Sequence, residues 1–209
     1  MSFGAPPTFY YELIMNKLKI FLETAFQNNR SSARTDRLHT ALLDLLINYD
    51  KKYTKYKWVF EYTLDPDGFK GTFKIDIAGF DKKGNLRVAV LAKCINQNMA
   101  QNIKNYAAIT ISETCRILDA KNPLVKIVDE IFFITIFPSH VPYFCEDGMV
   151  KRFENILVTR EKTDVTEVLN RVGKGLVRKM DITYDITDLR EKRDRRHFMN
   201  IIPTNIRIL

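Results

Sequence analysis

Residues 71–95 read GTFKIDIAGFDKKGNLRVAVLAKCI, two apolar segments separated by the polar, glycine-containing segment 81–85. Aliphatic and aromatic residues dominate both apolar segments, and the composition of 81–85 is typical of a tight turn. The pattern therefore predicts two antiparallel strands, 71–80 and 86–95, joined by a turn. Each predicted strand contains one charged residue among apolar neighbours, Asp76 in the first and Lys93 near the end of the second.

Further strands are predicted on both sides of this pair. The aromatic and β-branched segment 58–64 predicts a preceding strand, which would complete a three-stranded antiparallel meander. Segment 98–118 has apolar residues at helical spacing, and 131–137 is a continuous apolar run that suits a strand buried on both faces. A helix that links neighbouring strands of one sheet makes a right-handed crossover. We therefore expect strand 131–137 to lie parallel to strand 86–95.

The segments before the meander predict two helices. Residues 9–26 have the apolar spacing of one helical face. A second helix begins near Ser32 or Thr35, either of which can cap it, and ends near Asp50. The basic segment 51–57 then interleaves lysines with tyrosines. A solvated helix end explains such a run, and contact with phosphates and bases is the alternative.

The C-terminal third has weaker patterns. Residues 150–157 and 165–177 are interpreted as helices, and 182–186 as a short strand. The sequence contains no internal repeat, low-complexity tract or linker. We expect one α/β domain spanning 1–209, with a mixed central sheet flanked by helices in a core at 33–138 and a C-terminal elaboration at 139–209.

The overall composition indicates a globular protein. The chain has 209 residues, of which 45% are hydrophobic and 28% charged. No apolar run approaches the roughly 18 residues that span a bilayer, and residues 1–7 lack the pattern of a secretion signal. We therefore expect an intracellular protein, cytoplasmic or nuclear, that has no membrane partner. The three cysteines are widely spaced and odd in number, which predicts buried, reduced thiols.

The positive charge favours a polyanionic partner. The formal net charge is +8, and an excess of this size raises the local concentration of polyanions. Between residues 82 and 126 only two acids, Glu113 and Asp119, oppose eight basic residues, which are Lys82, Lys83, Arg87, Lys93, Lys104, Arg116, Lys121 and Lys126. Nucleic acid, in particular DNA, is therefore the expected partner, with a homodimer or a protein partner as alternatives.

The order of elements over 33–138, helix, three-stranded meander, helix and strand, resembles the PD-(D/E)XK superfamily, the restriction endonuclease-like proteins. This superfamily includes restriction endonucleases, resolvases and many phage and repair nucleases. The resemblance implies an α-βββ-α-β core in which an aspartate of the second strand and a Glu-x-Lys motif of the third meet at one edge of the sheet. Asp76 and Lys93 match these positions, whereas Leu91 occupies the place of the motif glutamate.

Strand pleating gives a physical reason for the pairing of Asp76 with Lys93. Side chains alternate across a strand, and same-face residues of adjacent strands are neighbours. We therefore expect the two charged groups to approach within hydrogen-bond or water-bridged distance. Phosphodiester hydrolysis uses a divalent cation on oxygen ligands and a positive group that offsets developing charge. Asp76 fits the first role, with Mg²⁺ or Mn²⁺ as the ion, and Lys93 fits the second.

A second carboxylate is needed, because Mg²⁺ is usually bound by one or two protein carboxylates beside phosphate and water. Asp36 is the first candidate, since several branches of the superfamily resemble this chain in placing an acid at the start of that helix. Glu61 on the first strand is the second candidate, and Glu113 reaches the site only if helix 98–118 bends toward it. The predicted catalytic residues are thus Asp76, Lys93, Asp36 and Glu61, and the three acids are the predicted metal ligands. His39 is interpreted as a packed or surface histidine.

Basic and polar residues around the third strand form the predicted nucleic-acid contacts. Gln97 and Gln101 resemble the polar positions by which some nucleases hold the scissile strand, and Asn102 with Tyr106 resembles the Gln-x-x-x-Tyr pattern of exonuclease branches. Solvated helix residues explain these positions equally well. The predicted contacts are Lys82, Lys83, Arg87, Gln97, Gln101, Lys104 and Tyr106.

Three functions remain open on the sequence. The first is a metal-dependent nuclease acting on DNA, which Asp76, Lys93 and the positive core favour. The second is a nuclease-like fold that binds nucleic acid or a protein without cutting, which Leu91 favours. The third is a structural or assembly protein that shares the topology. Because a decayed site has little reason to retain both Asp76 and Lys93, the first is the preferred hypothesis.

Overall fold

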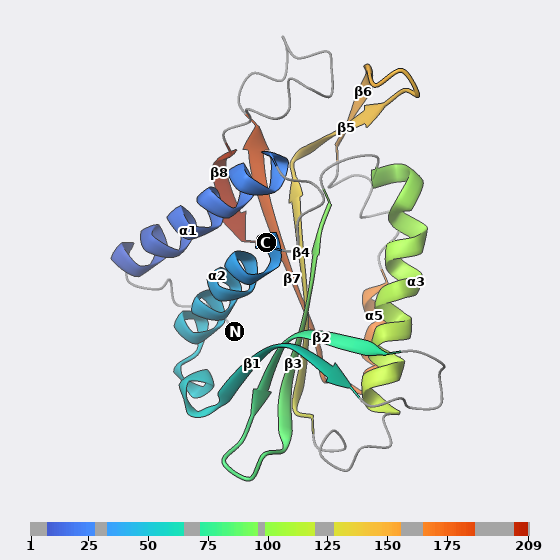
Figure 1. Cartoon of the computed structure of the whole chain (residues 1–209). Coiled ribbons are helices and arrows are strands. Elements are labelled where there is room, and N and C mark those ends of the chain that lie inside the picture. The colour runs from blue at the N-terminus through green and yellow to red at the C-terminus, as the bar shows by residue number, and fades with distance from the viewer. Residues whose placement is uncertain are drawn as a thin grey trace.

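The computed structural model describes residues 8–27, 33–64, 72–95, 99–119, 128–155, 165–186 and 203–208. Within these residues the protein has a six-stranded mixed sheet with strand order β1-β2-β3-β4-β7-β8 (Figure 1). Helices α1 (Thr8–Gln27) and α2 (Ala33–Tyr49) cover one face of the sheet, and α3 (Met99–Leu118) and α5 (Thr166–Val172) cover the other. The predicted α/β class with a mixed central sheet is therefore confirmed.

The predicted meander and crossover are also confirmed. Strands β1 (Lys57–Leu64), β2 (Phe73–Phe80) and β3 (Leu86–Cys94) pair antiparallel in sequence order. Strand β4 (Glu130–Pro138) pairs parallel to β3, with Ala89 opposite Ile131. Helix α3 links these two strands and runs back along the sheet between them, as a crossover requires (Figure 1).

The C-terminal part extends this sheet and corrects two predictions. The segment predicted as helix 150–157 is strand β6 (Val150–Asn155), which pairs with β5 (His140–Phe144) in a hairpin that projects beyond the sheet (Figure 1). The hairpin is closed by Asp147-Gly148, where Gly148 has φ +84°. A glycine in the left-handed conformation after a tight turn is common in hairpin loops, because glycine adopts positive φ without steric cost.

The predicted helix 165–177 is shorter, since only α5 is helical and β7 (Val177–Ile186) begins directly at its predicted end. Gly173 is the C-cap of α5, and Gly175 follows with φ +76°. Lys174, between these glycines, has φ +50°, and a left-handed residue directly after the C-cap commonly ends a helix. Strand β7 pairs parallel to β4, and β8 (Pro203–Ile208) pairs antiparallel to β7.

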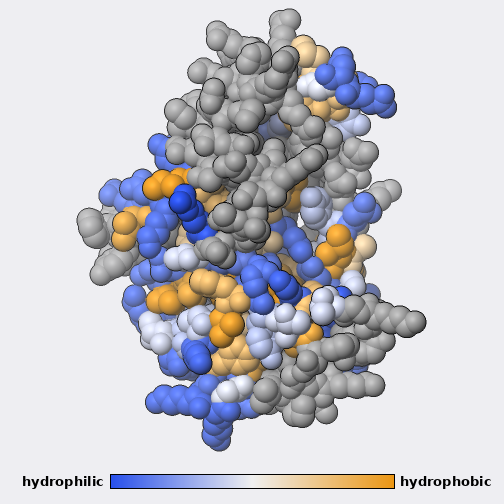
Figure 2. Space-filling view, in the orientation of Figure 1, coloured by the Kyte–Doolittle hydropathy of each residue, from blue (hydrophilic) through white to orange (hydrophobic). Residues whose placement is uncertain are grey.

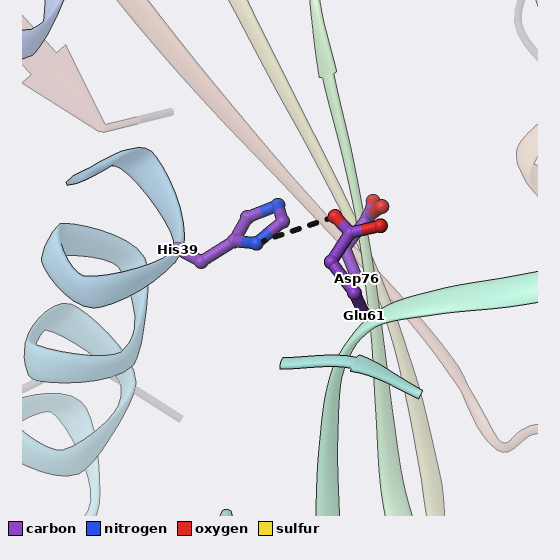
Figure 3. Close-up of side chains that lie close together, drawn as sticks. All are labelled: His39, Glu61 and Asp76. Atoms are coloured by element: carbon purple, nitrogen blue, oxygen red, sulfur yellow. Dashed lines mark ion pairs between the residues drawn. The ribbon is translucent and has the colours of Figure 1, made fainter. Parts of the chain in front are cut away.

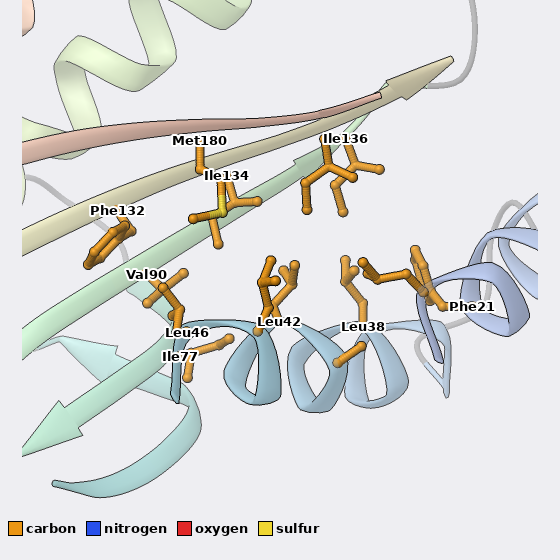
Figure 4. Close-up of a cluster of buried hydrophobic side chains, with 14 of the residues drawn as sticks. Phe21, Leu38, Leu42, Leu46, Ile77, Val90, Phe132, Ile134, Ile136 and Met180 are labelled. Atoms are coloured by element: carbon orange, nitrogen blue, oxygen red, sulfur yellow. The ribbon is translucent and has the colours of Figure 1, made fainter. Parts of the chain in front are cut away.

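The two faces of the sheet bury separate apolar clusters. Leu42 and Leu46 of α2 pack on Val90 and Ile134 in one cluster (Figure 4). On the other face, α3 and α5 pack against a cluster that contains Leu91, Ile131 and Phe133. Adjacent residues of β3 and β4 thus point into opposite clusters. This two-sided burial explains why their sequences are continuous apolar runs instead of alternating ones.

The cysteines are more exposed than predicted. Cys94 is half-buried, and Cys115 and Cys145 are exposed. Among the described helices, none is both long and apolar enough to cross a lipid bilayer.

One close contact at the β1–β2 ribbon gives a direct test of this packing. Gly79 lies opposite Trp58, and a Cβ at position 79 would lie 2.7 Å from the indole ring. The ring has little freedom to move, because its Nε1 donates a hydrogen bond to the carbonyl of Tyr53 at 3.1 Å. We expect Gly79→Ala to lower the free energy of unfolding by about 1–3 kcal/mol in chemical denaturation. The exposed substitution Thr63→Ala on β1 is the control, and equal stabilities of the two variants would contradict the packing described.

Candidate metal centre

Strand β2 separates from β3 at Asp76, and we call this point of separation the fork. The pairing of β2 with β3 ends at Ile77 opposite Val90, whereas β2 continues beside β1 as far as Phe73. Beyond the fork, as far as the described residues extend, β3 pairs only with β4. The carboxylate of Asp76 lies in the gap, where its Oδ2 accepts a hydrogen bond from the backbone N–H of Ala92 at 2.6 Å. The side chain thereby supplies the acceptor that a continued ladder would have supplied.

Glu61 turns the β1–β2 ribbon at the same point. Phe60 and its partner Ile77 pack in the cluster under α2, whereas Tyr62 and its partner Ile75 pack in the cluster under α3. In a regular strand residues two apart share a face. Glu61 has φ 52°, a left-handed conformation that is uncommon outside glycine and costs on the order of 1 kcal/mol. This turn reverses the faces of the ribbon beyond it and places Glu61 beside Asp76.

His39 of α2 completes a cluster with these two carboxylates. One ligand atom from each of His39, Glu61 and Asp76 lies within 4.8 Å of the others (Figure 3). The Nδ1 atom of His39 is 3.6 Å from Oε1 of Glu61. The imidazole is 1% exposed and packs beside the ring of Phe60. Within the described part of the chain, Nδ1 has no hydrogen-bond partner.

Lys93 of β3 and Glu113 of α3 form an ion pair near the fork. The ammonium of Lys93 donates a hydrogen bond to Oε1 of Glu113 at 2.8 Å. An approach of Lys93 to Asp76 through a bridging water stays a prediction, but no ion pair joins the two side chains directly among the described residues. The reason is that the carboxylate of Glu113 is itself only 14% exposed and binds the nearest cation. Helix α3 brings Glu113 to Lys93 by running back along the sheet.

The pKa values of two carboxyl groups in this region, Asp76 and Glu113, are raised by burial. Burial raises the pKa of Asp76, while the Ala92 N–H, His39 and Lys93 lower it and Glu61 raises it further. Burial also raises the pKa of Glu113, although the hydrogen bond from Lys93 lowers it. Desolvated carboxylates gathered in this way favour a bound cation, because its charge replaces the lost solvation.

The remaining predicted site residues are dispersed. Asp36 belongs to α2, but its side chain lies outside the described residues, as do the side chains of Gln101 and Lys104 in α3. Gln97 lies outside the described residues altogether. Tyr106 is half-buried and packs against the small cluster of Ile95, Phe137 and Val141. Packing therefore accounts for its place on α3.

Three of the four predicted basic contacts, Lys82, Lys83 and Arg87, lie near the β2–β3 turn, at the end where β2 and β3 remain paired. Lys82 and Lys83 are exposed in the β2–β3 turn. Figure 2 shows hydrophilic residues along the lower edge of the molecule. Together with Lys55, Tyr56, Asn85 and the acidic Asp81, these two lysines line an open hollow of about 550 Å³. Arg87 also lines it, but its guanidinium forms two hydrogen bonds to the carboxylate of Asp129, at 2.8 and 2.6 Å. Segments 51–57 and 82–87 thus contribute to one basic surface.

The structure adds His39 to the candidate ligands, a residue that the sequence interpretation had assigned to packing. A signal for it was present, because His39 lies on the buried stripe of α2 together with Leu38, Leu42 and Leu46. A histidine on such a stripe must satisfy a polar ring inside the protein. Glu113, ranked last among the acids, reaches Lys93 without contacting Asp76 in any hydrogen bond within the described residues.

Comparison with known proteins identifies no relative, since no family model, curated protein or solved structure matches the chain.

The raised pKa of Glu113 predicts a pH-dependent stability. An acid whose pKa is higher in the folded state contributes stability below its unfolded pKa of about 4.3, and this contribution is lost as pH rises through the folded pKa. Glutamine resembles the neutral acid. The melting temperature of Glu113→Gln relative to the wild type should therefore rise as pH increases above about 4.3, as measured by circular dichroism.

The exposed substitution Glu12→Gln in α1 is the control for loss of a carboxylate. A relative melting temperature of Glu113→Gln that falls with pH would show that the ion pair with Lys93 outweighs burial, contrary to this prediction.

Proposed function

We propose that the protein is a divalent-metal-dependent nuclease that cleaves DNA phosphodiester bonds. The observation that carries the proposal is the position of Glu61 beside Asp76 at the fork of the sheet. Leu91, at the place of the motif glutamate, is 1% exposed in the cluster under α3 and cannot bind a metal. Glu61 offers the second carboxylate that the sequence alone left uncertain.

The residues at the fork fit a divalent cation. Carboxylate oxygens from Asp76 and Glu61 suit Mg²⁺ or Mn²⁺, and Nδ1 of His39, which has no hydrogen bond within the described residues, offers a third donor. The hydrogen bond from Ala92 fixes the orientation of the Asp76 carboxylate. A bound cation would polarise the phosphoryl group and lower the pKa of a bound water.

Lys93 is the positive group that would stabilise the transition state. Its charge already lowers the pKa of Asp76, so that it acts electrostatically on the fork while hydrogen-bonded to Glu113. A preoriented cation near a phosphoryl group stabilises charge that develops during hydrolysis. Glu113 is a positioning residue in this scheme, because it holds the ammonium of Lys93.

The basic hollow supports DNA as the substrate. Lys82 and Lys83 present exposed ammonium groups at the β2–β3 turn, and Lys55 faces the same hollow. Phe80 at the turn lies four steps along β2 from Asp76, a span of about 13 Å at about 3.3 Å per residue. A duplex strand rises about 3.4 Å per phosphate, so this span corresponds to about four nucleotides. Phosphates that flank the cleaved bond are therefore the expected ligands of the hollow.

Binding without cleavage is the second candidate function, and the buried Leu91 favours it. In this case Asp76 and Glu61 would have a structural role only, such as the hydrogen bond from Ala92 to Asp76. The basic hollow would remain and would bind DNA. The two functions differ in their need for the carboxylates, which gives a simple test.

The nuclease proposal predicts metal-dependent degradation of DNA. The purified wild-type protein should cut plasmid and single-stranded DNA with Mn²⁺ or Mg²⁺, and the chelator EDTA should stop the reaction. Asp76→Asn and Glu61→Gln should each reduce the rate by roughly 100-fold or more, since each removes a charged group that acts in the transition state. Asp44→Asn, which alters the exposed ion pair of Asp44 with Lys17, is the matched control. An inactive wild type, or an active Asp76→Asn, would favour binding alone.

The hollow predicts how DNA affinity depends on salt. Each phosphate contact contributes about 0.9 to the slope of the logarithm of the binding constant against the logarithm of salt concentration. Fluorescence anisotropy on the Asp76→Asn background should show that Lys82→Ala with Lys83→Ala lowers both affinity and slope, the latter by about 1–2. Lys151→Ala, an exposed lysine of β6, is the control. Affinity that is equal at low and physiological salt would remove nucleic acid as the partner.

A further inference from the structure

We infer that the centre formed by His39, Glu61 and Asp76 binds Mn²⁺ in preference to Mg²⁺. The inference deepens the proposed function, and it rests on that function for the use of the metal in hydrolysis but not for its binding. It depends on His39, which the sequence interpretation did not include among the ligands.

The imidazole of His39 is built into the site. It is 1% exposed, and its ring lies 5.8 Å from the ring of Phe60, the residue that precedes the turn at Glu61. In Figure 3 the ring extends from α2 toward the two carboxylates. Leu38 and Leu42, on either side along α2, are buried in the cluster beneath the sheet, so the helix has no freedom to withdraw the ring. The position of the nitrogen is therefore set by packing.

The state of Nδ1 indicates a missing partner. Among the described residues this atom has no hydrogen bond, and the nearest carboxylate oxygen, on Glu61, is 3.6 Å away. Buried polar atoms are almost always satisfied, because an unsatisfied one retains the full cost of desolvation. A metal ion between the nitrogen and the carboxylates would satisfy it. A protonated His39 that pairs with Glu61 is the competing explanation, and it would repel a dication.

The composition of the donor set determines the choice of ion. Mg²⁺ prefers oxygen ligands in near-ideal octahedral geometry and dehydrates reluctantly. First-row transition metals accept imidazole nitrogen readily, and Mn²⁺ also suits carboxylate and water ligands. One nitrogen and two carboxylates, with the remaining positions left to water and phosphate, therefore favour Mn²⁺. The Ala92 N–H supports this arrangement by occupying one oxygen of Asp76 at 2.6 Å.

Metal titrations of the untagged full chain test the inference. Isothermal titration should show that the wild type binds Mn²⁺ roughly tenfold or more tightly than Mg²⁺. His39→Gln should weaken Mn²⁺ binding by roughly 10- to 100-fold while it changes Mg²⁺ binding much less. Asp76→Asn should weaken the binding of both ions. His39→Phe, which fills the buried volume, serves as a second variant, with circular dichroism to verify that each variant is folded.

A spectroscopic measurement keeps the test independent of any variant. Electron spin echo envelope modulation of Mn²⁺ bound to the wild type should contain ¹⁴N couplings from the imidazole. Equal affinities for the two ions, or bound Mn²⁺ without ¹⁴N coupling, would overturn the inference and leave the nuclease proposal intact. Bound Mn²⁺ with ¹⁴N coupling but no cleavage of DNA would support the inference and overturn the nuclease proposal. A wild type that binds neither ion would overturn both.

Discussion

The hydrogen bond from the Ala92 N–H to the carboxylate of Asp76 is the interaction on which the site depends. A buried backbone donor needs an acceptor, and the fork removes the carbonyl that the ladder would have provided. A carboxylate is a suitable replacement because a charge-assisted hydrogen bond is stronger than a neutral one. The same bond holds an acid in a desolvated place, where burial raises its pKa. One hydrogen bond thus determines both how the sheet ends its β2–β3 pairing and how the Asp76 carboxylate is held at the site.

The fork also explains why residues of both layers converge on one gap. His39 approaches from the layer of α1 and α2, whereas Lys93 and Glu113 belong to the side of α3. A continuous sheet would separate these groups. The left-handed turn at Glu61 moves the β1–β2 ribbon out of the sheet at the same point, so the strain at this residue accompanies the opening of the site. Backbone strain of this kind is found frequently at functional sites.

Local patterns predicted the core of the fold, because each was consistent with its neighbours. The apolar runs around Val90 and Ile134, the turn at 81–85 and the helical period of α3 all required the same crossover. The helix predicted at 150–157 was wrong because the turn at Asp147-Gly148 reverses the chain and pairs β6 with β5. The helix predicted at 165–177 was too long because the turn after α5 ends it.

The site was less predictable than the fold. Strand pleating identified the faces of Asp76 and Lys93 but could not specify that Lys93 would bind Glu113, twenty residues away on another element. Nothing in the residue type of Glu61 indicates positive φ, since this conformation is imposed by the ribbon around it. The role of His39 likewise follows from the tertiary structure. Periodicity predicts that the residue is buried, and only the folded chain shows that it lies beside Glu61 and Asp76.

A crystal structure of the protein grown with Mn²⁺ would test the central claim most directly, because anomalous scattering at the manganese edge locates the ion without reference to activity. The account predicts one strong anomalous peak at the fork, at about 2.0–2.3 Å from the ligand atoms of Asp76, Glu61 and His39. A fork without an anomalous peak, with Asp76 and Glu61 in their present positions, would contradict it.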